Sequence, residues 1–276
     1  MTIESWAGDV TELAQEAAAL ALQRFHEGAG WIEKGQGDWA SDADLEVEQL
    51  IRKGLAAIAP GTRVHGEEAG MVDHSALGSS SAQSALTWHV DPIDGSANFV
   101  RGIPHFATVI SLSEQTPSGD VCIHFGVTVD PCRGESFVAV RGNRTQLNGR
   151  DIHVAAERSA MKSLLAVVTP KPDVRYMESF LKWFSHQIVS VGGVRRSGAM
   201  ALDLAWLACG RIDAFAGFEL APWDIYAGVV QVVGAGGCAQ PHHRIRSFPN
   251  EEPLQLCLVA NCGSLLSKLS GDEDGS

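Results

Sequence analysis

Two aspartates stand three residues apart around a proline, at the end of an apolar segment. The segment LTWHVDPIDGSANF covers 86–99 and places Asp91 and Asp94 directly before Gly95 and Ser96. Two carboxylates that face one point repel each other unless a cation or a shared proton lies between them. Gly95 permits a sharp turn that exposes consecutive backbone N–H groups, which suit an anion. A proline turn with local Asx hydrogen bonds is the structural alternative, and this motif alone leaves both interpretations open.

Other acidic residues also stand where predicted strands end or predicted helices begin. Glu67 and Glu68 follow a short strand, and Asp224 stands at the start of a helix. Each position has an ordinary explanation, because acids after strands are common and an acid in the first helical turn is favoured by the helix dipole. Together with the two aspartates around the proline, these residues indicate an oxygen-lined site for a divalent cation at the end of a sheet.

The elements that must position these residues alternate between helices and strands. Apolar spacing predicts helices over 4–26, 42–58, 173–187, 198–209 and 222–234. Apolar runs predict a strand from 63, a strand that ends at the paired aspartates, and strands over 107–113, 121–129, 135–140, 163–170, 212–218 and 254–261. A hairpin is predicted over 141–154, and loops are predicted over 31–44 and 71–85.

The pattern of elements changes near residue 158. We therefore expect two tightly packed halves of α/β (α+β) character, 1–157 and 158–276. The first half carries most of the acids described above, and the second carries Asp224.

The composition is that of an acidic globular protein. The 276 residues include 21 basic and 33 acidic side chains, which gives a net charge of −12. Nucleic acids are bound by basic surfaces, so no nucleic-acid partner is expected for a chain this acidic. No apolar run approaches the ~20 residues that span a bilayer, and the acidic N-terminus is unlike a secretory signal. Six scattered cysteines without zinc-site spacing indicate reduced thiols and a cytoplasmic protein.

Several segments resemble the signatures of one enzyme family. WHVDPIDGSANF resembles the first signature of the inositol monophosphatase family, W-x-x-D-P-I-D-G-T-x-N-F, and PWDIYAGVVQVVGAGG resembles the second. The GEE at 66–68 and the hairpin RGNRTQLNG match further family segments, and the order agrees from about residue 5 to 262. The resemblance implies a layered α-β-α-β-α sandwich of the inositol monophosphatase/fructose-1,6-bisphosphatase type. It also implies a homodimeric, Mg²⁺-dependent phosphomonoesterase without a membrane partner.

The resemblance assigns roles to individual residues. Two or three Mg²⁺ ions are implied, and their ligands are Glu67, Asp91, the backbone carbonyl of Ile93, Asp94 and Asp224. Glu67 and Ser96, which stands where the family has threonine, are implied to orient the attacking water. Asp44 is implied to hydrogen-bond the Ser96 hydroxyl. Ser41 and Asp44 also form an S-x-x-D capping pattern for the helix that follows, and the two roles are compatible.

The implied substrate pocket departs from the family pattern. The substrate-binding residues that the resemblance implies are Gly95, Ser96, Gly198, Ala199, Met200 and Glu219. Ala97 replaces a second threonine, and Met200 stands where alanine is usual. Gly217 replaces a glutamate that grips ring hydroxyls, and Glu219 stands two residues later. These changes argue against myo-inositol phosphate as the preferred substrate, without arguing against phosphatase activity.

Several functions therefore remain open. The leading one is hydrolysis of a small phosphorylated alcohol, of the inositol or sugar phosphate class, by metal-activated water. Alternatives within the family are a sugar bisphosphatase, a histidinol-phosphate phosphatase and a phosphoadenosine-phosphate phosphatase. A non-catalytic regulatory protein that binds phosphate or metal is a further alternative. Arg195 and Arg196 either bind a second anionic group of the substrate or form a solvated turn.

Overall fold

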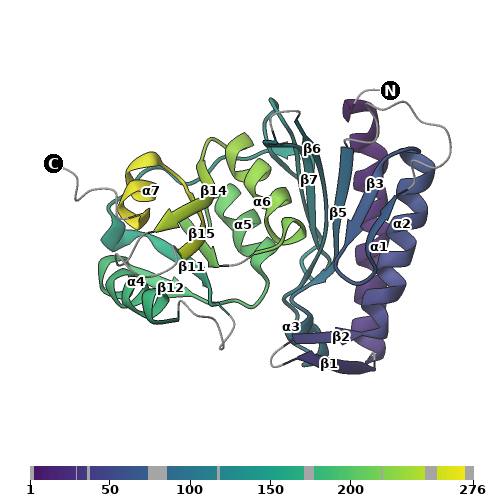
Figure 1. Cartoon of the computed structure of the whole chain (residues 1–276), viewed down its shortest axis with the longest axis horizontal. Coiled ribbons are helices and arrows are strands. Elements are labelled where there is room, and N and C mark those ends of the chain that lie inside the picture. The colour runs from purple at the N-terminus through teal and green to yellow at the C-terminus, as the bar shows by residue number, and fades with distance from the viewer. Residues whose placement is uncertain are drawn as a thin grey trace.

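Two β-sheets alternate with three layers of helices (Figure 1). The computed structural model describes residues 3–28, 30–35, 38–73, 86–116, 119–170, 177–218, 220–245 and 254–270. The outer layer on the first sheet consists of α1 (Ile3–Glu27) and α2 (Asp42–Ile58). The layer between the sheets consists of α5 (Met200–Ala208) and α6 (Pro222–Gly234). The outer layer on the second sheet consists of α4 (Met177–Ser190) and α7 (Gly263–Ser270).

The first sheet has eight strands in the order β10-β9-β8-β7-β6-β5-β3-β4. In chain order these are β3 (Arg63–Gly66), β4 (Gly70–Asp73), β5 (Leu86–Asp94), β6 (Ala107–Gln115), β7 (Val121–Asp130), β8 (Glu135–Val140), β9 (Gln146–Leu147) and β10 (Arg150–Asp151). All neighbours are antiparallel except β3 and β5, which run parallel. The chain therefore leaves β3 and β5 at the same edge of the sheet, where a short helix, α3 (Ser96–Val100), follows β5.

The second sheet has five strands in the order β12-β11-β13-β15-β14. They are β11 (Leu164–Val168), β12 (Gly193–Arg195), β13 (Ala214–Phe218), β14 (Cys238–Ile245) and β15 (Leu254–Ala260), and a 3₁₀ turn (Ala160–Lys162) precedes them. β11 pairs in parallel with β12 and β13, whereas β15 pairs antiparallel with β13 and β14. Val167 and Val168 at the end of β11 and Asp91 and Asp94 toward the end of β5 line the same cavity.

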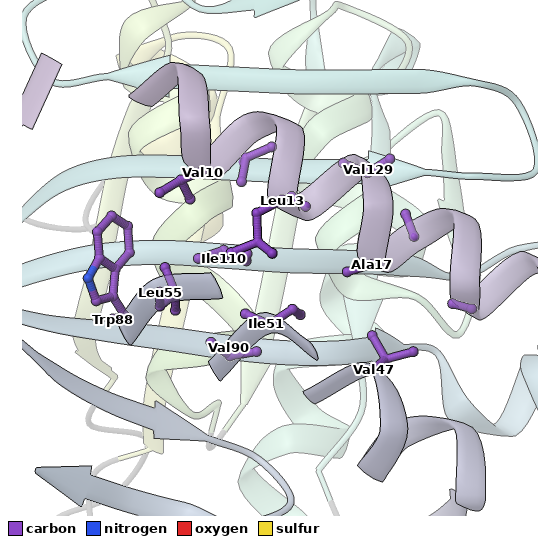
Figure 2. Packing of buried hydrophobic residues seen from close by; sticks show 14 of the residues in the cluster. Val10, Leu13, Ala17, Val47, Ile51, Leu55, Trp88, Val90, Ile110 and Val129 are labelled. Atoms are coloured by element: carbon purple, nitrogen blue, oxygen red, sulfur yellow. The ribbon is translucent and has the colours of Figure 1, made fainter. Parts of the chain in front are cut away.

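The outer helices pack on the first sheet through side chains at helical spacing. Figure 2 shows Val10, Leu13 and Ala17 of α1 beside Ile51 and Leu55 of α2, with the strands beneath them. All five side chains are buried. Burial of a side chain of leucine or isoleucine size contributes about 1.5–3 kcal/mol. This packing holds α2 firmly against the sheet, and α2 carries Asp44.

The structure differs from the sequence-based expectation in several short elements. The expected loop over 31–44 contains a hairpin of β1 (Trp31–Gly35) and β2 (Asp38–Ser41), and glycines near its turn hide the strands from pattern analysis. β14 was not predicted, because Pro241 interrupts its strand pattern at a register shift. α7 and β12 were also not expected, and 71–73 belong to β4. The remainder of the expected loop, 74–85, lies outside the described residues.

No helix in the described ranges is both long enough and apolar enough to cross a membrane. All six cysteines are free thiols.

Candidate active site

A β-bulge at the end of β5 brings Asp91 and Asp94 to one cavity. Asp91 pairs with Val109 of β6, and Asp94 pairs with Ala107, so three steps along β5 oppose two steps along β6. In a regular strand, residues three apart face opposite sides of the sheet. The extra residue of a bulge cancels that alternation. Both aspartates line the same cavity, and each is only 3% exposed.

The turn after β5 lies against the start of α5. Gly95 has a φ of 94°, and a Cβ atom there would lie 3.1 Å from the Ala199 Cβ. A side chain at Gly95 would therefore be strained and would push the two segments apart. The Asn98 side chain bridges the same two segments, because its Nδ2 donates to the Ser197 carbonyl at 3.1 Å. Residues about 100 positions apart in the sequence thus form one wall of the cavity.

Ser96 and Asp44 meet at the edge of this wall. The Ser96 Oγ lies 3.0 Å from the Ile93 carbonyl oxygen and 3.5 Å from the Asp44 Oδ1. The Asp44 Oδ2 accepts hydrogen bonds from the Ser41 backbone N–H at 2.7 Å and from the Ser41 hydroxyl at 2.6 Å. Asp44 therefore completes the capping box of α2 with one oxygen and approaches Ser96 with the other. The capping box is therefore confirmed, and the role of Asp44 toward the Ser96 hydroxyl in catalysis stays a prediction.

Glu67 and Asp224 reach the cavity from two other elements. Glu67 follows β3, and its backbone N–H donates to the Val90 carbonyl of β5 at 3.1 Å. Asp224 stands in the first turn of α6, where its Oδ2 accepts the N–H of Ala221 at 2.7 Å. The parallel pairing of β3 with β5 explains why Glu67 emerges beside the paired aspartates.

The four acids line one cavity of about 400 Å³. Its described lining residues are Glu67, Asp91, Ile93, Asp94, Gly95, Ser96, Ala97, Asn98, Val167, Val168, Arg196, Ser197, Gly198, Ala199, Met200, Asp203 and Asp224. Of the site residues expected from the sequence, Asp44 approaches the cavity only through Ser96. Glu219 lies outside the described residues. The structure brings all the others together.

Burial and mutual repulsion disfavour charge on these acids. The pKa of Asp91 is raised well above its ordinary value, first by burial and then by the neighbouring Glu67, Asp94, Asp224 and Asp44. Each of these neighbours adds negative charge, so a cation among them would relieve the repulsion. A bound cation or a shared proton is therefore favoured over a set of bare carboxylates.

Asp94 also joins the two halves of the chain. Burial raises its pKa, while hydrogen bonds from the backbone N–H groups of Ala201 and Met200 oppose that rise. These donors reach its Oδ2 at 2.8 Å and its Oδ1 at 3.2 Å. The carboxylate thus accepts from N–H groups at the start of α5, which have no acceptors within the helix itself.

The chemistry of the donor set fits a hard divalent cation. The candidate ligands are carboxylates and the Ile93 carbonyl, and Mg²⁺ prefers oxygen donors of this kind. Within the described residues, no three acidic, histidine or cysteine side chains already form a coordinating group. Asp91, Asp94 and Asp224 are each engaged by backbone N–H groups. The residues therefore provide suitable donors around one cavity rather than a closed coordination sphere.

The structure adds lining residues that the sequence did not single out. Asp203 of α5 is 3% exposed, and burial raises its pKa to about 7, against a hydrogen bond from Ser197. Val167 and Val168 form an apolar wall at the end of β11. Their strand pattern predicted burial but carried no sign that they line a cavity. Gly217 of β13 pairs with Val168 of β11 and is not among the lining residues.

The chain matches the inositol monophosphatase family over residues 4–261. It is 37% identical over 205 residues to an inositol-1-monophosphatase of Caulobacter vibrioides, covering 74% of this chain and 76% of the relative. It is 36% identical over 207 residues to the Nus factor SuhB of Pseudomonas aeruginosa, covering 74% and 73%.

A solved structure shares the whole fold. The extragenic suppressor protein suhB of Bartonella henselae superposes with a TM-score of 0.82 at 28% identity, over 98% of each chain. The layered α-β-α-β-α sandwich expected from the signatures is thereby confirmed. With the family match over nearly all of its length and identities above 30%, this chain is a phosphoric monoester hydrolase and belongs to the inositol monophosphatase family.

Proposed function

We propose that this protein is a Mg²⁺-dependent phosphomonoesterase that hydrolyses a small phosphorylated alcohol by attack of an activated water. The observation that carries the proposal is the gathering of Glu67, Asp91, Asp94 and Asp224 around one cavity, with Ser96 at its edge. The family is metal-dependent, which agrees with this arrangement.

Two or three Mg²⁺ ions would be held by Glu67, Asp91, the Ile93 carbonyl, Asp94 and Asp224. When bound, such ions lower the pKa of water and neutralise charge on a phosphoryl group. Glu67 directly follows β3, and Asp91 lies on the neighbouring strand β5, so they would hold one side of the site. Asp94 and Asp224 would hold the other side. Asp94 accepts N–H groups from the start of α5, and Asp224 stands in the first turn of α6.

Ser96 and Glu67 would orient the water for attack. The Ser96 hydroxyl has one hydrogen and two lone pairs. When it donates to Asp44, its lone pairs can accept a hydrogen from the water. Asp44 is suited to this task because the Ser41 capping box holds its other oxygen in place. Glu67 would accept the second hydrogen of the water.

The start of α3 would bind the phosphate. Gly95 and Ser96 line the cavity, and their backbone N–H groups would bind phosphate oxygens. Arg196, an exposed residue of the cavity lining, would contact any further anionic group of the substrate. Arg195 is not among the lining residues.

The alcohol portion of the substrate would meet a mixed wall. Met200, Val167 and Val168 are apolar, whereas Asp203 and Gly198 offer polar contacts. A site that binds a hydroxyl discriminates strongly because an unmatched buried polar group is costly. The apolar wall therefore favours an alcohol with fewer hydroxyls, or a larger one, over inositol.

We expect myo-inositol 1-phosphate not to be the best substrate. Some less hydroxylated or larger monoester should show a higher kcat/KM, by about tenfold if one apolar group is matched. The measurement is kcat/KM for inositol, sugar, histidinol and nucleotide monophosphates under identical Mg²⁺ conditions. A clear preference for inositol 1-phosphate would show that this interpretation of the pocket is wrong.

The same panel tests the proposed activity. Phosphate release should require Mg²⁺ and should occur with at least one monoester. The SuhB relative named as a Nus factor motivates the alternative of a non-catalytic regulatory role. Absence of release from every monoester, at saturating Mg²⁺ and with the protein folded, would favour that alternative.

The expected assembly and location belong to the same proposal. A homodimer should appear in light scattering as twice the chain mass of 29.4 kDa. The net charge of −12 supports a protein that does not bind nucleic acid. A cytoplasmic location agrees with the six free thiols.

A further inference from the structure

A buried carboxylate outside the cavity binds the turn that carries Glu67. Glu48 of α2 has a side chain only 2% exposed. Its Oε2 accepts the backbone N–H of Glu68 at 2.8 Å, and its Oε1 accepts that of Ala69 at 3.1 Å. A buried carboxylate requires such partners. Glu48 is not among the described residues that line the cavity, so its contacts are directed at the turn itself.

Arg52 extends the same contact to both strands beside the turn. Its Nε donates to the Glu48 Oε1 at 2.7 Å, and its Nη2 donates to the Gly70 carbonyl at 2.6 Å. Its Nη1 lies 3.4 Å from the Val64 carbonyl oxygen. Arg52 therefore ties the end of β3 and the start of β4 to α2, one helical turn beyond Glu48.

The turn is shaped to admit the Glu48 carboxylate. A Cβ atom on Gly66 would lie 2.4 Å from the Glu48 Oε1, so any larger residue at this position would displace the carboxylate. On the other side of the turn, the Glu67 N–H donates to Val90 of β5. Glu67 is thus held between the Glu48 carboxylate and β5, the strand that carries Asp91.

The helix α2 contacts the segments of both residues that are proposed to orient the water, Ser96 and Glu67. Asp44 and Glu48 are four residues apart on α2 and therefore share a helix face. Asp44 approaches Ser96, whereas Glu48 holds the turn of Glu67. Because α2 is packed on the sheet through buried Ile51 and Leu55, neither contact moves independently of the other.

We propose that Glu48 and Arg52 are positioning residues that set the Glu67 carboxylate for metal binding. This inference rests on the proposed function, in which Glu67 is a metal ligand. Partners that orient a ligand from outside the coordination sphere typically change metal affinity by about 10–100-fold. A role limited to holding the fold would instead lower thermal stability and leave the metal affinity unchanged.

The test is Mg²⁺ affinity of the full chain, measured by isothermal titration calorimetry, together with Tm and kcat. Glu48→Gln keeps the side-chain shape but removes the charge that binds Arg52 and both turn N–H groups. We expect it to weaken Mg²⁺ binding by about 10–100-fold. The substrate KM at saturating Mg²⁺ should change little. The conservative variant Glu48→Asp should retain more affinity than Glu48→Gln.

Two control variants separate positioning from stability. Val47→Ala removes buried volume from the neighbouring position of α2 and should lower Tm without changing Mg²⁺ affinity. Glu46→Gln, also on α2, breaks a solvent-exposed ion pair with Arg24 of α1 and should change neither quantity much. If Glu48→Gln behaves like Val47→Ala, with lower Tm and wild-type affinity, the inference is overturned.

Further variants keep the test decisive. If Glu48→Gln does not fold, Arg52→Lys replaces it, since lysine keeps the charge but cannot reach Glu48 and Gly70 together. Weakened Mg²⁺ binding in that variant supports the inference, and wild-type affinity overturns it. Glu67→Gln tests the proposed function separately. If the wild-type chain does not bind Mg²⁺, or if Glu67→Gln binds it as tightly as the wild type, the metal site itself is wrong. If Glu67→Gln weakens Mg²⁺ binding but the variants of Glu48 and Arg52 do not, only the inference about Glu48 and Arg52 is refuted.

Discussion

Asp91→Asn should lower kcat/KM by about 10³-fold or more while the fold persists. The charge of Asp91 is coupled to the other acids, because Glu67, Asp94, Asp224 and Asp44 all raise its pKa. Asparagine has nearly the same shape but lacks the charge that would be shared between ions. Steady-state phosphate release with the best substrate of the panel measures the loss.

The fold of Asp91→Asn should be intact, and its Tm should equal or exceed that of the metal-free wild type. Removing one charge from a buried acidic cluster relieves repulsion. Asp9→Asn is the matched control, since Asp9 is exposed on α1 and should leave activity unchanged. Near wild-type turnover by a folded Asp91→Asn protein would refute the assignment of the metal site.

Removal of divalent cations should abolish phosphate release, and Mg²⁺ should restore it. The cavity acids are buried together, so a bound cation stabilises the folded chain relative to the unfolded one. At Mg²⁺ concentrations about 100 times the dissociation constant, linkage predicts about 2.7 kcal/mol of stabilisation. That corresponds to a rise in Tm of about 5 °C or more for a chain of this size.

Thermal unfolding with and without Mg²⁺ measures this effect directly. Sodium chloride of equal ionic strength is the control, because screening alone also weakens repulsion between charges. In Asp91→Asn the rise caused by Mg²⁺ should shrink to the level of the salt control. An equal rise in sodium chloride, or activity that survives chelation, would contradict a metal-dependent mechanism.

Local patterns predicted the elements that carry their own signal. The apolar spacing of α1 and α2, the strand β5 with its paired aspartates and the start of α6 at Pro222 each lie within one continuous segment. The capping pattern of Ser41 and Asp44 was also visible, because its two residues are three apart. Such features depend on neighbours in the chain, so the sequence shows them directly.

Elements whose stability comes from distant partners were missed. β14 contains Pro241 and a register shift, and it persists because β15 pairs with it. The hairpin of β1 and β2 contains glycines, which are typical of loops, although its two strands pair with Trp31 opposite Ser41. The division of the chain into 1–157 and 158–276 remains a prediction, and α6 from the second part packs against the first sheet (Figure 1).

The sequence by itself determined the candidate donor atoms of the site and the family to which the chain belongs. Carboxylates at Glu67, Asp91, Asp94 and Asp224, with a hydroxyl at Ser96, are present whatever the fold. Their chemistry suits a hard cation and a phosphate because oxygen donors and exposed N–H groups have those preferences in any setting.

Only the tertiary structure decided how those atoms act together. The bulge in β5 turns both aspartates to one side, and burial among other acids raises the pKa of Asp91. The close approach of Gly95 to Ala199 builds the cavity wall, and the hydrogen bonds of Glu48 hold the turn of Glu67. These properties depend on distances between segments far apart in the chain, and local sequence patterns carry no information about such distances.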